Sequence, residues 1–86
     1  MNTFLLKVST PEGEVYKADV NCLSVRGTEG DLAVMSGHIP LITAVKPCIC
    51  NIEDEIGKIY SADIGEGILA VSADETILLV SKFDLR

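Results

Sequence analysis

Tryptophan does not occur in this sequence of 86 residues, and phenylalanine and tyrosine contribute only two residues each. Basic side chains are also scarce: seven lysines and arginines stand against thirteen aspartates and glutamates, which gives a net charge of −6. They form no cluster along the chain. Nucleic acids and anionic lipid head groups attract basic surfaces, so neither is predicted as a partner.

Long apolar runs are missing as well. The longest, such as Ile77–Val80, are far shorter than the roughly 20 residues that a membrane-spanning helix needs. The N-terminal segment MNTFLLKVST has no basic region, and Lys7 interrupts its apolar part, so no signal peptide is predicted. We therefore expect a soluble, cytoplasmic chain without direct insertion into a membrane.

Cysteine occurs three times, an odd number that fits a reducing compartment better than a disulfide framework. Cys22, Cys48 and Cys50 together with His38, the only histidine, offer ligand types that suit zinc. However, a single C-x-C motif is much weaker evidence for a zinc site than paired C-x-x-C motifs. The cysteines are interpreted as small buried hydrophobic residues, and no metal and no cofactor is predicted.

Helical periodicity is missing, and apolar residues alternate with polar ones along most of the chain. Short alternating runs separated by turn residues are expected to form strands at Thr3–Ser9, Glu14–Ala18, Val20–Arg26, Leu32–Met35, Leu41–Val45, Cys48–Glu53, Ile59–Ala62, Gly67–Ala73 and Thr76–Ser81. About nine strands at this spacing are typical of an all-β sandwich or barrel. The expected core consists of Phe4, Leu6, Val8, Leu23, Val25, Leu69, Val71, Leu78 and Val80, without any helix longer than about two turns.

Three of these runs, LITAV, GILAVSA and TILLVS, are apolar on both sides of the strand. In a two-layer sandwich only one side of a strand faces the core, so their second side meets water. Hydrophobic residues make up 48% of the chain, which is high for a domain of this size. The doubly apolar strands therefore predict a docking surface for another protein.

No group of residues carries a convincing catalytic pattern. Ser36 and His38 are close in sequence, but they lack the G-x-S-x-G context of a nucleophilic serine. The acidic run Glu53–Glu55 falls in an expected hairpin turn, where carboxylates are usually solvated. Lys17 leaves one alternative open, a small β carrier domain with a modifiable lysine, although Lys17 lies within an expected strand. The chain is predicted not to be an enzyme.

The segment EGDLAVMSGHIPLITAVKP resembles the epsilon subunit of the F-type, or rotary, ATP synthase. The residues that match its pattern are Glu29, Gly30, Asp31, Leu32, Val34, Gly37, His38, Pro40, Leu41, Ile42, Thr43, Lys46 and Pro47. The segments STPEGEVYKADVNCLSVRGTEG and GEGILAVSADETILLV are similar to the beginning and the end of the same domain, so the resemblance covers the whole chain. Ala33, Ser36, Cys48 and Glu66 depart from the pattern at glycine or proline positions, which affects loop shape.

The resemblance implies a single domain over residues 1–86, a sandwich of two antiparallel sheets with about nine or ten short strands. It further implies a non-catalytic subunit of the central stalk that couples proton or sodium flow to ATP synthesis. Such a subunit would be peripheral to the cytoplasmic side of the cell membrane and monomeric when isolated. The family's C-terminal helical hairpin is expected to be absent, and with it the inhibitory brake on ATP hydrolysis.

Two groups of site residues follow from the resemblance. Glu29 and Asp31 match positions that face the polar loops of the membrane ring. The partner-facing corner near the gamma subunit consists of His38, Ile39, Leu41, Ile42 and Thr43. In this interpretation His38 holds a structural corner and is not a general base.

Overall fold

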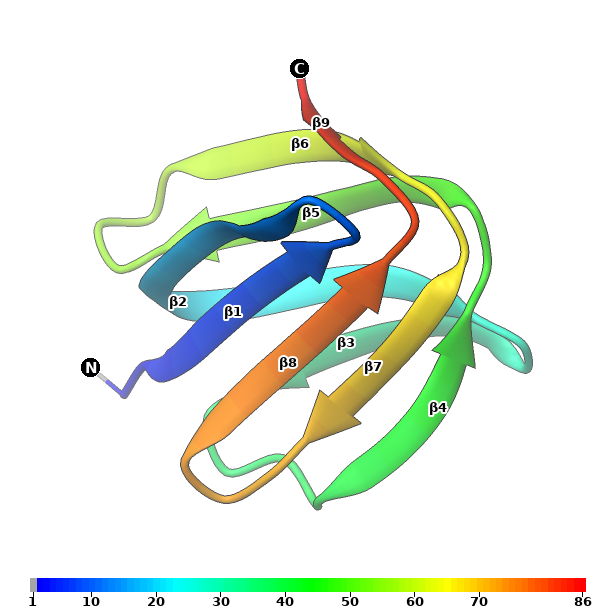
Figure 1. The fold of residues 1–86 in the computed structure, drawn as a ribbon. Coiled ribbons are helices and arrows are strands. Elements are labelled where there is room, and N and C mark those ends of the chain that lie inside the picture. The colour runs from blue at the N-terminus through cyan, green and yellow to red at the C-terminus, as the bar shows by residue number, and fades with distance from the viewer. Residues whose placement is uncertain (1) are drawn as a thin grey trace.

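The computed structural model describes residues 2–86, which form nine strands and the turns between them (Figure 1). The strands are β1 (Phe4–Thr10), β2 (Gly13–Gly27), β3 (Gly30–Met35), β4 (Leu41–Val45), β5 (Cys48–Asp54), β6 (Ile59–Ile64), β7 (Gly67–Val71), β8 (Glu75–Val80) and β9 (Phe83–Leu85). No helix occurs among the described residues, and so none of membrane-spanning length does. The all-β prediction is confirmed.

The strands pair into one continuous sheet that folds over into two layers (Figure 1). The front layer has the order β4-β7-β8-β1, and the back layer has the order β3-β2-β5-β6-β9. Every pairing is antiparallel except that of β1 with β8, which is parallel. The expectation of purely antiparallel sheets is therefore corrected at this one position. Alternation in a sequence reports the face of each residue but not the direction of the neighbouring strand.

The long strand β2 belongs to both layers. Its first part pairs with β1, where Phe4 lies opposite Val20, and its second part pairs with β3 and β5. The pairing with β5 shifts register between Val20 and Cys22, where the strand passes from one layer to the other. The two strands expected at 14–18 and 20–26 are thus one strand with a bulge.

The core lies between the layers and is built from the alternating apolar residues. The fully buried side chains include Leu6, Leu23, Leu69 and Leu78, and of the residues predicted for the core only Phe4 is half-buried. Phe4 still packs against the cluster. Alternation therefore located the core correctly, because in a sandwich the inner face of each strand is dry.

A short C-terminal strand, β9, completes the back layer and was not predicted. Its three residues pair with β6, and Arg86 beyond it donates two hydrogen bonds to the carboxylate of Asp63 at 3.0 and 3.2 Å. The Arg86 guanidinium lowers the pKa of the Asp63 carboxyl. Because this pKa is lower in the folded state, the stability that the pair contributes is lost as the pH falls through it.

Candidate interaction surfaces

The outward side of the front layer carries a continuous set of apolar side chains. We call this set the outer apolar face; it consists of Ile42, Ala44, Ile68, Ala70, Ile77 and Leu79. These residues are neighbours in register: Ile42 lies opposite Ala70, Ala44 opposite Ile68, Ala70 opposite Ile77 and Ile68 opposite Leu79. Because cross-strand partners in a ladder point to the same side, the six side chains form one surface across β4, β7 and β8.

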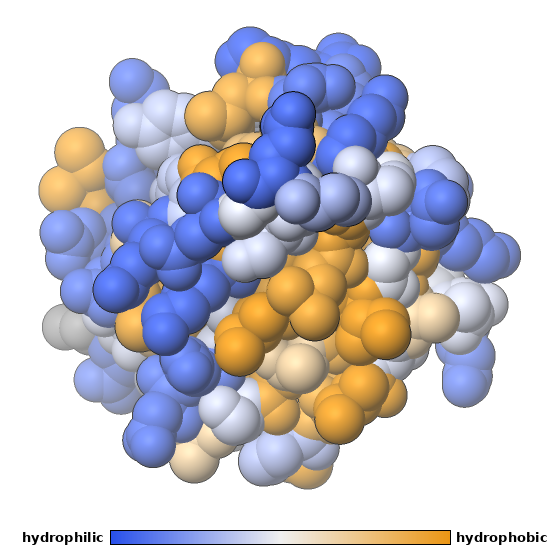
Figure 2. All heavy atoms as spheres, viewed as in Figure 1, coloured by the Kyte–Doolittle hydropathy of each residue, from blue (hydrophilic) through white to orange (hydrophobic). Residues whose placement is uncertain are grey.

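This surface is open to water in the isolated chain. Ile42 is 77% exposed, and Ile68 and Leu79 are each 48% exposed. Figure 2 shows apolar side chains gathering over β7 and β8 on the near side of the molecule, bordered by polar ones. Exposed apolar patches with a polar rim are typical of protein interaction sites.

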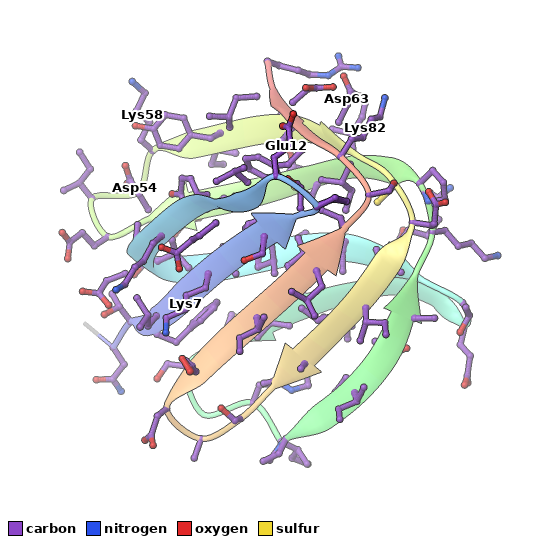
Figure 3. All side chains as sticks on the ribbon, viewed as in Figure 1. Lys7, Glu12, Asp54, Lys58, Asp63 and Lys82 are labelled. Carbon is purple, nitrogen blue, oxygen red and sulfur yellow. The ribbon has the colours of Figure 1, made fainter. Side chains whose placement is uncertain are left out.

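The rim of the face on the β1 side is polar. The ammonium group of Lys7 lies 3.2 Å from a carboxylate oxygen of Glu75, and Lys7 is paired across the ladder with Ile77. Figure 3 shows Lys7 on β1 at this border. The ion pair marks the limit of the apolar surface on this side.

The Ser36–Pro40 segment forms a corner between β3 and β4. The backbone N–H of His38 donates to the carbonyl oxygen of Met35 at 3.0 Å, and Gly37 has φ = 84°, which favours glycine at this position. His38 Nδ1 lies 2.7 Å from the carbonyl oxygen of Ile39, so the tautomer protonated at Nδ1 donates a hydrogen bond there. These bonds stabilise the turn at this corner.

The predicted partner-facing residues of this corner divide into two groups. The side chains of Ile39 and Ile42 are 78% and 77% exposed, and Ile42 belongs to the outer apolar face. Leu41 is half-buried and packs against the core, while Thr43 is half-buried beside Gly27. Alternation along β4 explains the division, since Leu41 and Thr43 point to the opposite side from Ile42.

Replacing His38 by alanine is expected to lower the free energy of unfolding by about 1 kcal/mol, because the hydrogen bond to Ile39 is lost. The measurement is the urea midpoint of the isolated domain. His38→Gln, which keeps a donor, serves as the control and is expected to lose less. Equal unfolding curves for the native protein and the alanine variant would contradict this role.

The acidic residues predicted to face a ring lie at the β2–β3 hairpin. Asp31 forms an exposed ion pair with Arg26, its cross-strand partner, at 3.0 Å between Nε and Oδ1. Glu29 lies exposed in the two-residue turn that joins the strands. Asp31 therefore already has a basic partner within the chain, which leaves Glu29 as the freer of the two carboxylates.

The second acidic turn, at the tip of the β5–β6 hairpin, is organised by Asp54. Its Oδ1 accepts hydrogen bonds from the backbone N–H groups of Ile56 at 3.0 Å and Lys58 at 2.8 Å. Figure 3 shows Asp54 and Lys58 at this tip. Asp54 thus serves the turn itself, as an aspartate commonly does at such a position.

The cysteines do not gather into a metal site. Within residues 2–86, no group of three or more histidine, cysteine, aspartate or glutamate side chains is placed to hold a metal ion. Cys50 is buried, and burial raises the pKa of its thiol to about 11. At neutral pH this thiol is therefore protonated and behaves as a small hydrophobic residue.

Lys17, the residue of the carrier-domain alternative, lies in the middle of β2. It pairs across the ladder with Lys7 of β1, and no turn lies beside it. Lys17 is therefore not displayed at a hairpin tip for modification. No other feature of residues 2–86 favours the carrier-domain alternative.

Some exposed apolar residues were not singled out as site residues from the sequence. They include Ile68 and Leu79 in the outer apolar face and Met35, which is 58% exposed at the end of β3. Further examples are Val15, Ile49, Ile56, Ile59, Tyr60 and Leu85. The apolar character of both sides of β7 and β8 was the sequence pattern that pointed to Ile68 and Leu79. Met35 had no comparable pattern, because its neighbours on the exposed side of β3 are one acidic residue, Asp31, and one small residue, Ala33.

Comparison with known proteins places the chain in a family. The sequence model of the family described as "ATP synthase, Delta/Epsilon chain, beta-sandwich domain" matches residues 3–85 of this chain. A Bacillus velezensis protein named ATP synthase epsilon chain is 34% identical over 79 residues, covering 92% of this chain and 59% of the relative. A Staphylococcus aureus protein of the same name is 36% identical over 81 residues, covering 93% and 60%. The chain thus spans about three-fifths of the length of these curated relatives.

Solved structures share the fold. A chain of the mitochondrial ATP synthase from Euglena gracilis matches with a TM-score of 0.91 at 20% identity, covering 96% of this chain and 53% of that chain. A chain of the central stalk and ring of the Tetrahymena thermophila mitochondrial ATP synthase matches with a TM-score of 0.77 at 14% identity. This second match covers 95% of the present chain and 66% of the other.

Proposed function

Because this chain belongs to the family of ATP synthase delta/epsilon-chain β-sandwich domains, we propose that it is a non-catalytic rotor subunit of an F-type ATP synthase. It docks on the gamma subunit and on the polar loops of the membrane ring. In this position it couples the rotation driven by ion flow to the shaft that drives ATP synthesis. The chain binds at the cytoplasmic side of the membrane as a peripheral part of the complex and is monomeric when isolated.

The observation that carries the proposal is the outer apolar face. A monomeric enzyme of this size would need a cleft with converging polar groups, whereas a docking subunit needs a broad apolar surface with a polar rim. The face runs across three neighbouring strands and ends at the Lys7–Glu75 ion pair. We assign it to the gamma subunit, because the two predicted corner residues that are exposed, Ile39 and Ile42, lie on it or next to it.

The ring contact is assigned to the β2–β3 hairpin. Its tip carries Glu29 and Asp31, and Asp31 is paired with Arg26. An acidic tip fits a loop with a basic side chain, and such exposed pairs contribute about 0.2–1 kcal/mol each.

A binding experiment tests the proposal. The 86-residue chain is added to an F-type complex from which the endogenous epsilon subunit has been removed, and co-sedimentation with the gamma subunit and the ring is measured. We expect stoichiometric binding and restored coupling of ATP hydrolysis to ion pumping. A chain that folds but does not co-sediment at micromolar concentration would contradict the proposed function.

The ring assignment makes a separate prediction. The double variant Glu29→Lys and Asp31→Lys is expected to bind the isolated ring about threefold to thirtyfold more weakly at low salt, and the difference shrinks at high salt. The control is Glu12→Lys and Glu55→Lys, which makes the same charge change at two other exposed turns. Equal ring binding by the two double variants would show that the hairpin tip has no specific ring contact.

A further inference from the structure

β4 lies at the edge of the front layer along most of its length. All five of its residues pair with β7, whereas on the opposite side only Val45 pairs, with Gly27 of β2. Among residues 2–86, no strand pairs with Leu41–Ala44 on that side. Figure 1 shows β4 at the border of the front layer. This segment therefore presents an open strand edge.

The polar backbone groups of Ile42 point to this open side. Successive residues of a strand direct their N–H and C=O groups to alternate sides. The N–H of Lys46, four positions further on, donates to the carbonyl oxygen of Arg26 on the β2 side at 2.9 Å. The N–H and C=O of Ile42 consequently face the same side, beyond the reach of β2.

Within β4 itself the edge carries none of the residues that usually prevent strand addition, although Pro40 precedes the strand and Lys46 and Pro47 follow it. Edge strands are commonly protected by lysine, proline or a bulge. The segment LITAV has no charged residue and no proline, and its pairing with β7 shows no register shift. The Ile42 side chain above it is 77% exposed. Such an edge is suited to accept another extended chain.

The space beside the edge fits the side chains of an added strand. A groove of about 280 Å³ separates β4 from β3 and is lined by Gly27, Glu29, Gly30, Asp31, Leu32, Leu41 and Thr43. An added strand would alternate its side chains between this groove and the outer apolar face. Leu32 and Leu41 give the inner position an apolar part beside the acidic residues Glu29 and Asp31, and Ile42 makes the outer position apolar.

We propose that a short extended segment of the gamma subunit, apolar on the side that continues the outer apolar face, adds as a strand to the open edge of β4. It exchanges backbone hydrogen bonds with Ile42 and extends the outer apolar face by one strand. This inference rests on the proposed function and specifies how the partner is held. A helix lying on the face would leave the Ile42 backbone groups bonded to water, whereas a strand satisfies them.

Amide hydrogen exchange tests the mode of binding directly. The Ile42 amide is expected to exchange rapidly in the isolated chain and at least about tenfold more slowly when the chain is bound to the gamma subunit. The reason is that the amide would then be hydrogen-bonded to the added strand and could exchange only when that strand separates. Unchanged exchange at Ile42 in a complex that does form overturns strand addition and leaves the proposed function intact. Failure of the native chain to bind the gamma subunit overturns both. Protection that appears with the chain alone at high concentration would instead identify a second copy as the occupant and overturn the proposal.

A pair of substitutions at the same position separates the backbone from the side chain. Ile42→Pro removes the N–H that faces the open edge, where proline is tolerated, and Ile42→Ala removes more of the apolar side chain but keeps the N–H. We expect the proline variant to bind the gamma subunit about threefold to tenfold more weakly than the alanine variant. Equal weakening by both, with unfolding midpoints that show both variants folded, would overturn the proposal.

Discussion

Replacement of Ile68 by aspartate is expected to reduce the affinity of the chain for the gamma subunit by roughly 100-fold. Ile68 lies in the interior of the outer apolar face, between Ala44 and Leu79 in register. Burying an isoleucine side chain in an interface contributes about 1.5–3 kcal/mol, and a carboxylate at the same place adds the cost of desolvating a charge. The measurement is the dissociation constant of the 86-residue chain from the gamma subunit.

Ile49→Asp is the matched control for this experiment. Ile49 is also an isoleucine, also 48% exposed, and lies on the outer side of β5 in the back layer. The two variants have the same charge and composition, so only the surface differs. We expect Ile49→Asp to bind like the native chain. Equal loss of affinity in both variants, or in neither, would contradict the assignment of the docking surface to the front layer.

Gly67→Ala is expected to destabilise the domain by about 3 kcal/mol or more. Gly67 begins β7, and a Cβ atom added to it would overlap the carbonyl oxygen of Leu79 and crowd the Cα of Val80 on β8. These are backbone atoms, so no side-chain rotation relieves the overlap, and β7 must move away from β8. A domain of this size has a total stability of only about 4–13 kcal/mol, so the urea midpoint should fall sharply.

Gly27→Ala provides the comparison for that prediction. Gly27 is buried at the end of β2, but a Cβ atom there would meet Ala44 O, Gly30 O and Thr43 Oγ1 at 3.5, 3.6 and 3.8 Å, which are ordinary contacts. We expect a change in unfolding free energy of less than about 1 kcal/mol. A Gly67→Ala variant as stable as Gly27→Ala would show that β7 and β8 separate more easily than their pairing implies.

The core could be predicted from the sequence because burial in a sandwich depends on one local property, the alternation of each strand. Leu6, Val8, Leu69 and Leu78 follow this alternation and are all fully buried. Phe4, at the start of β1, is the exception, because the end of a strand is less well covered than its middle.

Features that depend on contacts between distant segments could not be predicted in the same way. The passage of β2 between the layers requires β1 and β5 to pair with different parts of it. The three residues of β9 are too few to show a pattern and form a strand only because the edge of β6 is available. The Arg26–Asp31 pair likewise results from the register of the β2–β3 hairpin.

The exposure of each residue in the predicted interaction corner could not be predicted from the sequence either. Its five residues were assigned together by resemblance to a family motif, and such a motif does not state the orientation of each side chain. The structure exposes Ile39 and Ile42 and turns Leu41 toward the core. Substitution of Leu41 therefore affects both the packing of the core and the groove beside β4, whereas substitution of Ile42 tests binding more directly.

The parallel pairing of β1 with β8 has a consequence for how this chain reaches its native state. Leu5 lies opposite Glu75 in this ladder, so nearly the whole chain must be available before the front layer can close. Contacts between residues so far apart in sequence slow folding, because the entropy of closing the intervening loop is lost before the contact is made. During synthesis, β1 therefore emerges long before one of its two neighbours. Until β8 arrives, β1 has only β2 beside it, and its second edge is open to wrong partners.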